Sequence, residues 1–161
     1  LGFGIEPDAP EFEQLRTDFL NYHAEHGCDH SHLFDGMAEL VDELERRKLP
    51  WGIVTNKPHR FTVPLMQALG YADRAACLIS GDTCARAKPF PDQLLKAAND
   101  ICVAPEHCLY LGDDLRDMQA ARAANMRGII ASYGYVSADA SVENWQADGS
   151  IAAPMELLRF L

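Results

Sequence analysis

The sequence has no long hydrophobic run and little positive charge. No stretch of about 18 apolar residues occurs in the 161-residue chain, which argues against a membrane-spanning helix. Lys and Arg number 14 against 24 Asp and Glu, and the formal net charge is −10. Nucleic-acid binders need clustered Lys and Arg, so neither a nucleic acid nor a membrane is an expected partner. A single lysine is nevertheless enough to hold one phosphate group.

Paired cysteines are also missing. The five Cys residues are scattered, odd in number and form no CxxC pair, which favours a reducing cytoplasm over a secreted disulfide scaffold. The chain begins at Leu1 without an initiator Met, and we expect the natural N-terminus to lie upstream. The composition, 48% hydrophobic and 24% charged, fits one globular domain with a hydrophobic core.

The hydrophobic pattern alternates between helices and short strands. Helices are predicted near residues 10–22, 37–44, 61–69, 91–102 and 115–124, with a short last helix from Pro154, and strands at 51–55, 76–80, 108–112 and 128–131. The strands are continuous apolar runs, which is typical of a parallel sheet buried on both faces. We therefore predict an α/β fold: a Rossmann-like parallel sheet with helices on both faces.

Polar side chains follow three of the predicted strands. They are Thr55, Asn56 and Lys57 after the first, Lys88 in the loop after the second, and Asp113, Asp114 and Asp117 after the third. Ligands of open α/β sheets bind at the carboxyl ends of the strands, so these groups are expected to meet. Carboxylates suit Mg²⁺, and a lysine beside a metal neutralises a transferring phosphoryl group. The pattern favours magnesium-dependent phosphoryl transfer.

Taken singly, each of these residues has a simpler explanation. A Thr at a strand end is usually a strand former, and Asp113 and Asp114 could simply cap the next helix. The joint order of the three motifs favours the functional interpretation. It also argues against a phosphoacceptor receiver domain, whose acidic pair precedes its Thr and Lys. A noncatalytic relative that binds only phosphate or a partner protein remains the alternative.

The motifs resemble a known family. Val54–Pro58, Lys88–Pro89 and Leu111–Asp117 look like the second, third and fourth motifs of haloacid dehalogenase superfamily phosphatases, in particular the phosphoglycolate phosphatases. Trp51–Arg60 and Tyr133–Val136 further resemble the N-acetylmuramic acid 6-phosphate phosphatases of peptidoglycan recycling. The resemblance implies a hydrolase of a small phosphorylated metabolite, either N-acetylmuramic acid 6-phosphate or 2-phosphoglycolate.

The resemblance also implies roles for individual residues. Thr55, Lys88 and Asp117 would be catalytic: Thr55 binds the phosphoryl group, Lys88 anchors it, and Asp117 orients Lys88 or supports the metal shell. Asn56 and Lys57 would contact the substrate. Asp113 would be a direct Mg²⁺ ligand, and Asp114, which stands where relatives often have Ser, is a weaker candidate ligand.

One motif of the family is not found. Its first strand ends in Asp-x-Asp, whose first carboxylate attacks phosphorus, and no such motif precedes Thr55. We expect that strand upstream of Leu1, residues 1–32 to be the end of a helical cap with a linker, and residues 33–161 to be the core. Without the central strand, strands 51–55 and 108–112 are expected to pair or to be bridged by another segment, to invite self-association through exposed edges, and to leave the fragment inactive.

Four histidines cluster in the expected linker. His23, His26, His30 and His32 surround Cys28, a composition also found in transition-metal sites. A solvated linker is the favoured interpretation.

Overall fold

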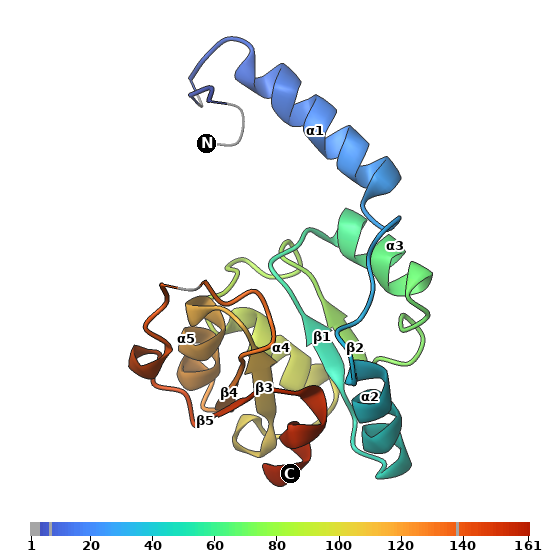
Figure 1. The fold of residues 1–161 in the computed structure, drawn as a ribbon, viewed down its shortest axis with the longest axis vertical. Helices are drawn as coiled ribbons and strands as arrows, with labels where there is room; N and C mark the ends of the chain where they lie inside the picture. Colours follow the sequence, from blue (N-terminus) through green and yellow to red (C-terminus); the bar gives the residue numbers. More distant parts are fainter. Residues whose placement is uncertain (1–3, 7, 138) are drawn as a thin grey trace.

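The computed structural model describes residues 4–6, 8–137 and 139–161 (Figure 1). The helices are α1 (Phe12–His26), α2 (Met37–Arg46), α3 (His59–Ala68), α4 (Asp92–Asp100) and α5 (Leu115–Ala123). The strands are β1 (Gly52–Val54), β2 (Cys77–Ile79), β3 (Leu109–Gly112), β4 (Arg127–Ala131) and β5 (Gly149–Ile151). Three short 3₁₀ helices span Pro105–His107, Val142–Asn144 and Pro154–Arg159. No helix in these ranges is long and apolar enough to cross a membrane.

All strand pairings are parallel, which confirms the predicted fold class. β1 pairs with β2, and β3 pairs with β4, which pairs with β5. Helices lie beside these strands in Figure 1, and α1 projects away from the α/β body. The Lys88 ammonium contacts both the Val54 carbonyl at the end of β1 and Asp117 after β3, so the polar motifs that follow these two strands meet.

The strands form two sheets rather than one. Direct pairing of β1 with β3, one expected outcome, does not occur in the described part of the chain, and no described strand lies between them. Side chains bridge the interval instead. The Val54 carbonyl accepts hydrogen bonds from Tyr110 Oη at 3.0 Å and from Lys88 Nζ at 3.2 Å. This main-chain oxygen on β1 is thereby satisfied without a neighbouring strand.

Two groups of buried side chains form the core. One lies under α4 and α5 and consists of Leu94, Ala98, Ala120, Ala121, Ala124 and Met126. The other joins α2 to the β4–β5 edge and consists of Leu40, Ile129, Ile151 and Leu157. The many alanines of α5 let this helix approach β3 and β4 closely, which fixes the loop between β3 and α5.

Some local predictions were wrong. The α1 helix continues to His26, four residues beyond the predicted end. It buries none of its side chains, so its polar last residues can stay helical after the apolar pattern ends. α3 begins at His59, two residues earlier than predicted, and Pro64 lies inside it. β5 was missed because its three residues, Gly-Ser-Ile, contain no apolar run.

Candidate active site

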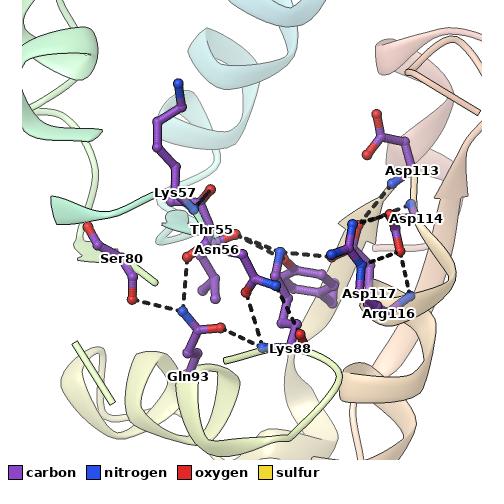
Figure 2. A network of polar contacts seen from close by, with 12 residues as sticks. Thr55, Asn56, Lys57, Ser80, Lys88, Gln93, Asp113, Asp114, Arg116 and Asp117 are labelled. Atoms are coloured by element: carbon purple, nitrogen blue, oxygen red, sulfur yellow. Dashed lines mark hydrogen bonds and ion pairs between the residues drawn. The ribbon is translucent and has the colours of Figure 1, made fainter. Parts of the chain in front are cut away.

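A buried ion pair forms the centre of the site (Figure 2). Lys88 Nζ lies 2.8 Å from Asp117 Oδ1, and the two side chains are only 10% and 8% exposed. The same ammonium donates to Tyr110 Oη at 2.8 Å and to the Val54 carbonyl. These contacts engage all three ammonium hydrogens, so the charge is held in one position between β1 and β3.

Asp117 is positioned by the start of α5. Its Oδ2 accepts the backbone N–H groups of Asp113 and Asp114, both at 3.2 Å, as the third residue of a capping box. A Cβ added to Gly112 would lie 2.5 Å from the Asp117 carboxyl group. Glycine is therefore needed at the end of β3 because Asp117 occupies the space beside it.

Asp114 is committed to the helix cap. Its Oδ1 accepts from the backbone N–H of Arg116 at 2.8 Å, and its Oδ2 accepts from the guanidinium at 2.6 Å. Arg116 consequently lowers the pKa of Asp114 to about 2. These bonds occupy both carboxylate oxygens, so metal ligation by Asp114 stays a prediction.

Asp113 lies apart from the ion pair. In Figure 2 its carboxylate points away from Lys88 and Asp117. Oδ2 accepts from the backbone N–H of Tyr135 at 2.7 Å, and a Cβ on Gly134 would lie 2.5 Å from this oxygen. Within the described ranges, no group of three or more His, Cys, Asp or Glu is arranged to hold a metal. Asp113 fits a Mg²⁺ ion that takes one or two carboxylates and obtains its other ligands from water and phosphate.

The segment after β1 meets the Lys88 loop. The Asn56 side chain donates to the Lys88 carbonyl at 2.9 Å and accepts from the Lys88 N–H at 3.1 Å. Its amide therefore positions the lysine, and direct contact of Asn56 with a substrate stays a prediction. Thr55 Oγ1 accepts from the Lys57 N–H at 3.0 Å. The Thr55 hydroxyl hydrogen can still point toward a ligand.

Gln93 is a structural part of the site that the sequence analysis missed. It is fully buried on α4, donates to the carbonyls of Thr55 and Ser80 at 2.9 and 2.8 Å, and accepts from the Lys88 N–H at 2.9 Å. One side chain thus ties β1, β2 and the Lys88 loop together. The available signal was weak, because a single polar residue beside Leu94 is common on a helix.

Tyr110 was missed as well. It lies in the middle of β3, where its ring supports Lys88 Nζ at 5.3 Å from the ring centroid. Burial raises the pKa of Tyr110 well above its usual value, and the carboxylates of Asp117 and Asp113 add to this effect. A phenol inside an otherwise apolar strand run was the signal that could have identified it.

The predicted residues do not all converge. The structure brings together Thr55, Asn56, Lys88 and Asp117, and it leaves Asp113 and Asp114 at the rim. Lys57 points away from the ion pair in Figure 2, and its Nζ lies 3.3 Å from His23 Nε2 on α1. The clustered histidines and Cys28 form no metal site in the part of the chain that is described.

Comparison with known proteins agrees with this architecture. A model of the haloacid dehalogenase-like hydrolase family matches residues 5–131. N-acetylmuramic acid 6-phosphate phosphatase of Pseudomonas putida is 42% identical over 159 residues, which cover 99% of this chain and 71% of the relative. Phosphoglycolate phosphatase of Xylella fastidiosa is 42% identical over 154 residues, covering 96% and 67%.

Solved structures show the same fold. A predicted phosphoglycolate phosphatase from Haemophilus somnus superposes with a TM-score of 0.86 at 23% identity, over 93% of this chain and 66% of that one. CbbY from Rhodobacter sphaeroides in complex with phosphate gives 0.77 at 22% identity, over 93% and 67%. The family match across most of the chain, together with the relatives at 42% identity, shows that this protein belongs to the haloacid dehalogenase-like hydrolases.

Proposed function

We propose that the whole protein containing this chain hydrolyses a small phosphomonoester. The observation that carries the proposal is the buried Lys88–Asp117 pair, which lies between β1 and β3 where a parallel sheet binds its ligands. A lysine fixed by a carboxylate, a phenol and a carbonyl keeps its charge in place while a phosphoryl group reacts. The family membership agrees with this chemistry.

Each side chain has a defined task in this proposal. Lys88 neutralises negative charge on the phosphoryl group, and the Thr55 hydroxyl donates a hydrogen bond to a nonbridging oxygen. Asp117 orients Lys88 through the 2.8 Å ion pair. Asp113 contributes one carboxylate to a Mg²⁺ ion, and this ion would supply further charge neutralisation when bound.

The proposed substrate is N-acetylmuramic acid 6-phosphate, with 2-phosphoglycolate second. The support is the 42% and 41% identity to the Pseudomonas putida and Pseudomonas aeruginosa enzymes named for the first compound. Both compounds carry a carboxylate besides the phosphate. The two candidate substrates are therefore both acidic phosphomonoesters, and they differ in size.

Other properties are proposals as well. We assign residues 1–32 to the end of a cap with a linker and residues 33–161 to the core, in line with the projection of α1 from the body in Figure 1. The cytoplasm is the proposed location because the five cysteines are free.

Self-association through the edges of β1 and β3 is proposed because neither strand pairs on that side in the described residues. Sedimentation at several concentrations tests it.

Steady-state kinetics tests the function. The full-length natural protein with Mg²⁺ is expected to release phosphate from N-acetylmuramic acid 6-phosphate with a higher kcat/KM than it shows toward 2-phosphoglycolate. Lys88→Ala should abolish this turnover, and the isolated 161-residue chain should show none above its own Lys88→Ala control. A clear preference for 2-phosphoglycolate would refute the narrower assignment. Phosphate binding without any turnover by the full-length protein would favour the noncatalytic alternative.

A further inference from the structure

Three basic side chains line a crevice between α1 and α3. They are His23, Lys57 and Arg60, and the remaining lining residues are Ala24, Gly27, Cys28, Phe61 and Pro64. No carboxylate is among these residues, although the whole chain has a formal net charge of −10. A basic lining on an acidic protein produces a local positive potential that attracts anions.

Lys57 has no anionic partner among the described residues. Its side chain is half-buried, and the one contact of its ammonium in this part of the chain is the 3.3 Å approach to His23 Nε2. Lysine carries three donor hydrogens, and a neutral imidazole nitrogen accepts only one of them. A partly desolvated cation without a counter-charge is costly, so the site is electrostatically suited to receive an anion.

Aromatic contacts hold the basic groups in place. The His23 ring lies edge-on to Phe61, with ring centroids 4.9 Å apart, and the Arg60 guanidinium lies 4.5 Å from the centroid of the same ring. Phe61 is itself buried, with 7% of its surface exposed. The imidazole of His23 and the guanidinium of Arg60 are therefore both positioned against a buried ring.

The start of α3 adds to the positive potential. Its first turn contains no acidic residue and includes His59 and Arg60, although helix N-termini favour negative charge. A carboxylate contacts this turn: Asp82 Oδ1 accepts from the His59 N–H at 2.8 Å. Asp82 lies outside the lining of the crevice, so the side that faces α1 keeps its excess of positive charge.

The crevice adjoins the proposed phosphate site. Lys57 follows Thr55 by two residues, which limits the distance between their Cα atoms to about 7 Å. Its backbone N–H donates to Thr55 Oγ1, while Figure 2 shows its side chain directed away from Lys88 and Asp117. A ligand whose phosphate contacts Thr55 can thus direct a second anionic group toward Lys57.

We propose that His23, Lys57 and Arg60 form a subsite for the carboxylate of the substrate. This inference rests on the proposed function and deepens it, because it makes the carboxylate a determinant of specificity. Lys57 provides the principal charge-assisted hydrogen bond, and Arg60 provides a second positive charge. His23 comes from α1, so the subsite is complete only when α1 lies against α3.

The test compares two phosphomonoesters that differ in one group. The probes are 2-phosphoglycolate and ethyl phosphate, which share a two-carbon skeleton, and the measured quantity is the ratio of their kcat/KM values for the full-length protein. Lys57→Met is expected to lower the ratio about tenfold, equivalent to 1.4 kcal/mol, mainly because the carboxylated probe binds less tightly and its KM rises. Arg60→Met should lower the ratio in the same direction, and Lys57→Arg should restore part of it.

A matched control separates this effect from general loss of charge. Lys96 on α4 is paired with Asp100 at 2.9 Å and is remote in sequence from the crevice. Lys96→Met is expected to leave the ratio within about twofold of the natural protein. Circular dichroism melts establish that each variant is folded before its kinetics is compared.

Calorimetric titration separates failure of the subsite from failure of the proposed function. With turnover intact, an unchanged ratio in both Lys57→Met and Arg60→Met overturns the subsite alone. If neither of the two probes nor N-acetylmuramic acid 6-phosphate releases phosphate, the proposed function is overturned. Titration of the same protein with both compounds then decides the subsite: tighter binding of 2-phosphoglycolate that Lys57→Met abolishes supports it, and equal binding refutes it.

Discussion

Replacing Lys88 with Met removes one charge from the buried ion pair. The Asp117 residue is only 6% exposed, so its carboxylate would remain buried, with the backbone N–H groups of Asp113 and Asp114 at 3.2 Å as its partners. Breaking a buried pair at one side typically costs about 3–5 kcal/mol, because the remaining charge stays desolvated. Domain stabilities are about 5–15 kcal/mol, so Lys88→Met is expected to remove a large part of the free energy of unfolding.

A double variant identifies the origin of this loss. Asp117→Asn removes the second charge but retains an oxygen that can accept from Asp113 N and Asp114 N. The pair Lys88→Met with Asp117→Asn should therefore be more stable than Lys88→Met alone. The coupling energy from the double-mutant cycle is expected to be about 2–3 kcal/mol, near the upper part of the range for residues in contact.

Urea unfolding followed by circular dichroism measures these differences at pH 7. The free energy of unfolding is compared among the natural sequence, both single variants and the double variant. The comparison is valid if the slope of this free energy against urea concentration is the same for all four proteins. A loss below about 1 kcal/mol for Lys88→Met, or additive effects in the double variant, would refute the argument. Either result would mean that water reaches the pair and screens its charges.

Three further predictions concern neighbouring residues. Because burial raises the pKa of Tyr110, its contribution to stability is complete below pH 10 and is lost as the pH rises further. Tyr110→Phe should therefore reduce the fall of Tm at alkaline pH. At pH 7 the same variant should lose about 1 kcal/mol of stability through its lost hydrogen bonds. Arg116 lowers the pKa of Asp114 from 3.8 to about 2, so its contribution is complete above pH 4 and is lost between about pH 4 and 2; Asp114→Asn should flatten that part of the Tm profile, and an unchanged slope would contradict the assignment. Gly134→Ala would place a Cβ 2.5 Å from Oδ2 of Asp113, so it should weaken Mg²⁺ binding in calorimetry, and unaltered affinity would exclude Asp113 as a ligand.

Local sequence patterns were sufficient for the fold class and for the residues at the strand ends. Apolar runs such as Gly128–Ala131 predict buried parallel strands because each residue in such a run has an apolar environment on either face. Asp117 Oδ1 lies 2.8 Å from Lys88 Nζ, and its role, to orient Lys88 or to support the metal shell, stays a prediction. Strand geometry predicted only that the polar groups after the strands meet, and the resemblance to the haloacid dehalogenase phosphatases supplied the role of Asp117.

The tertiary structure alone decided which of these polar atoms are available for chemistry. Asn56 holds the Lys88 backbone, and Gln93 on a distant helix holds both Thr55 and Lys88. Tyr110 reaches Val54 across 56 positions of sequence. Hydrogen bonds between distant segments leave no periodic trace in a sequence, because each partner satisfies its own local pattern. Composition and periodicity therefore determined where the site lies, whereas the three-dimensional packing determined which side chains support it and which remain free to bind.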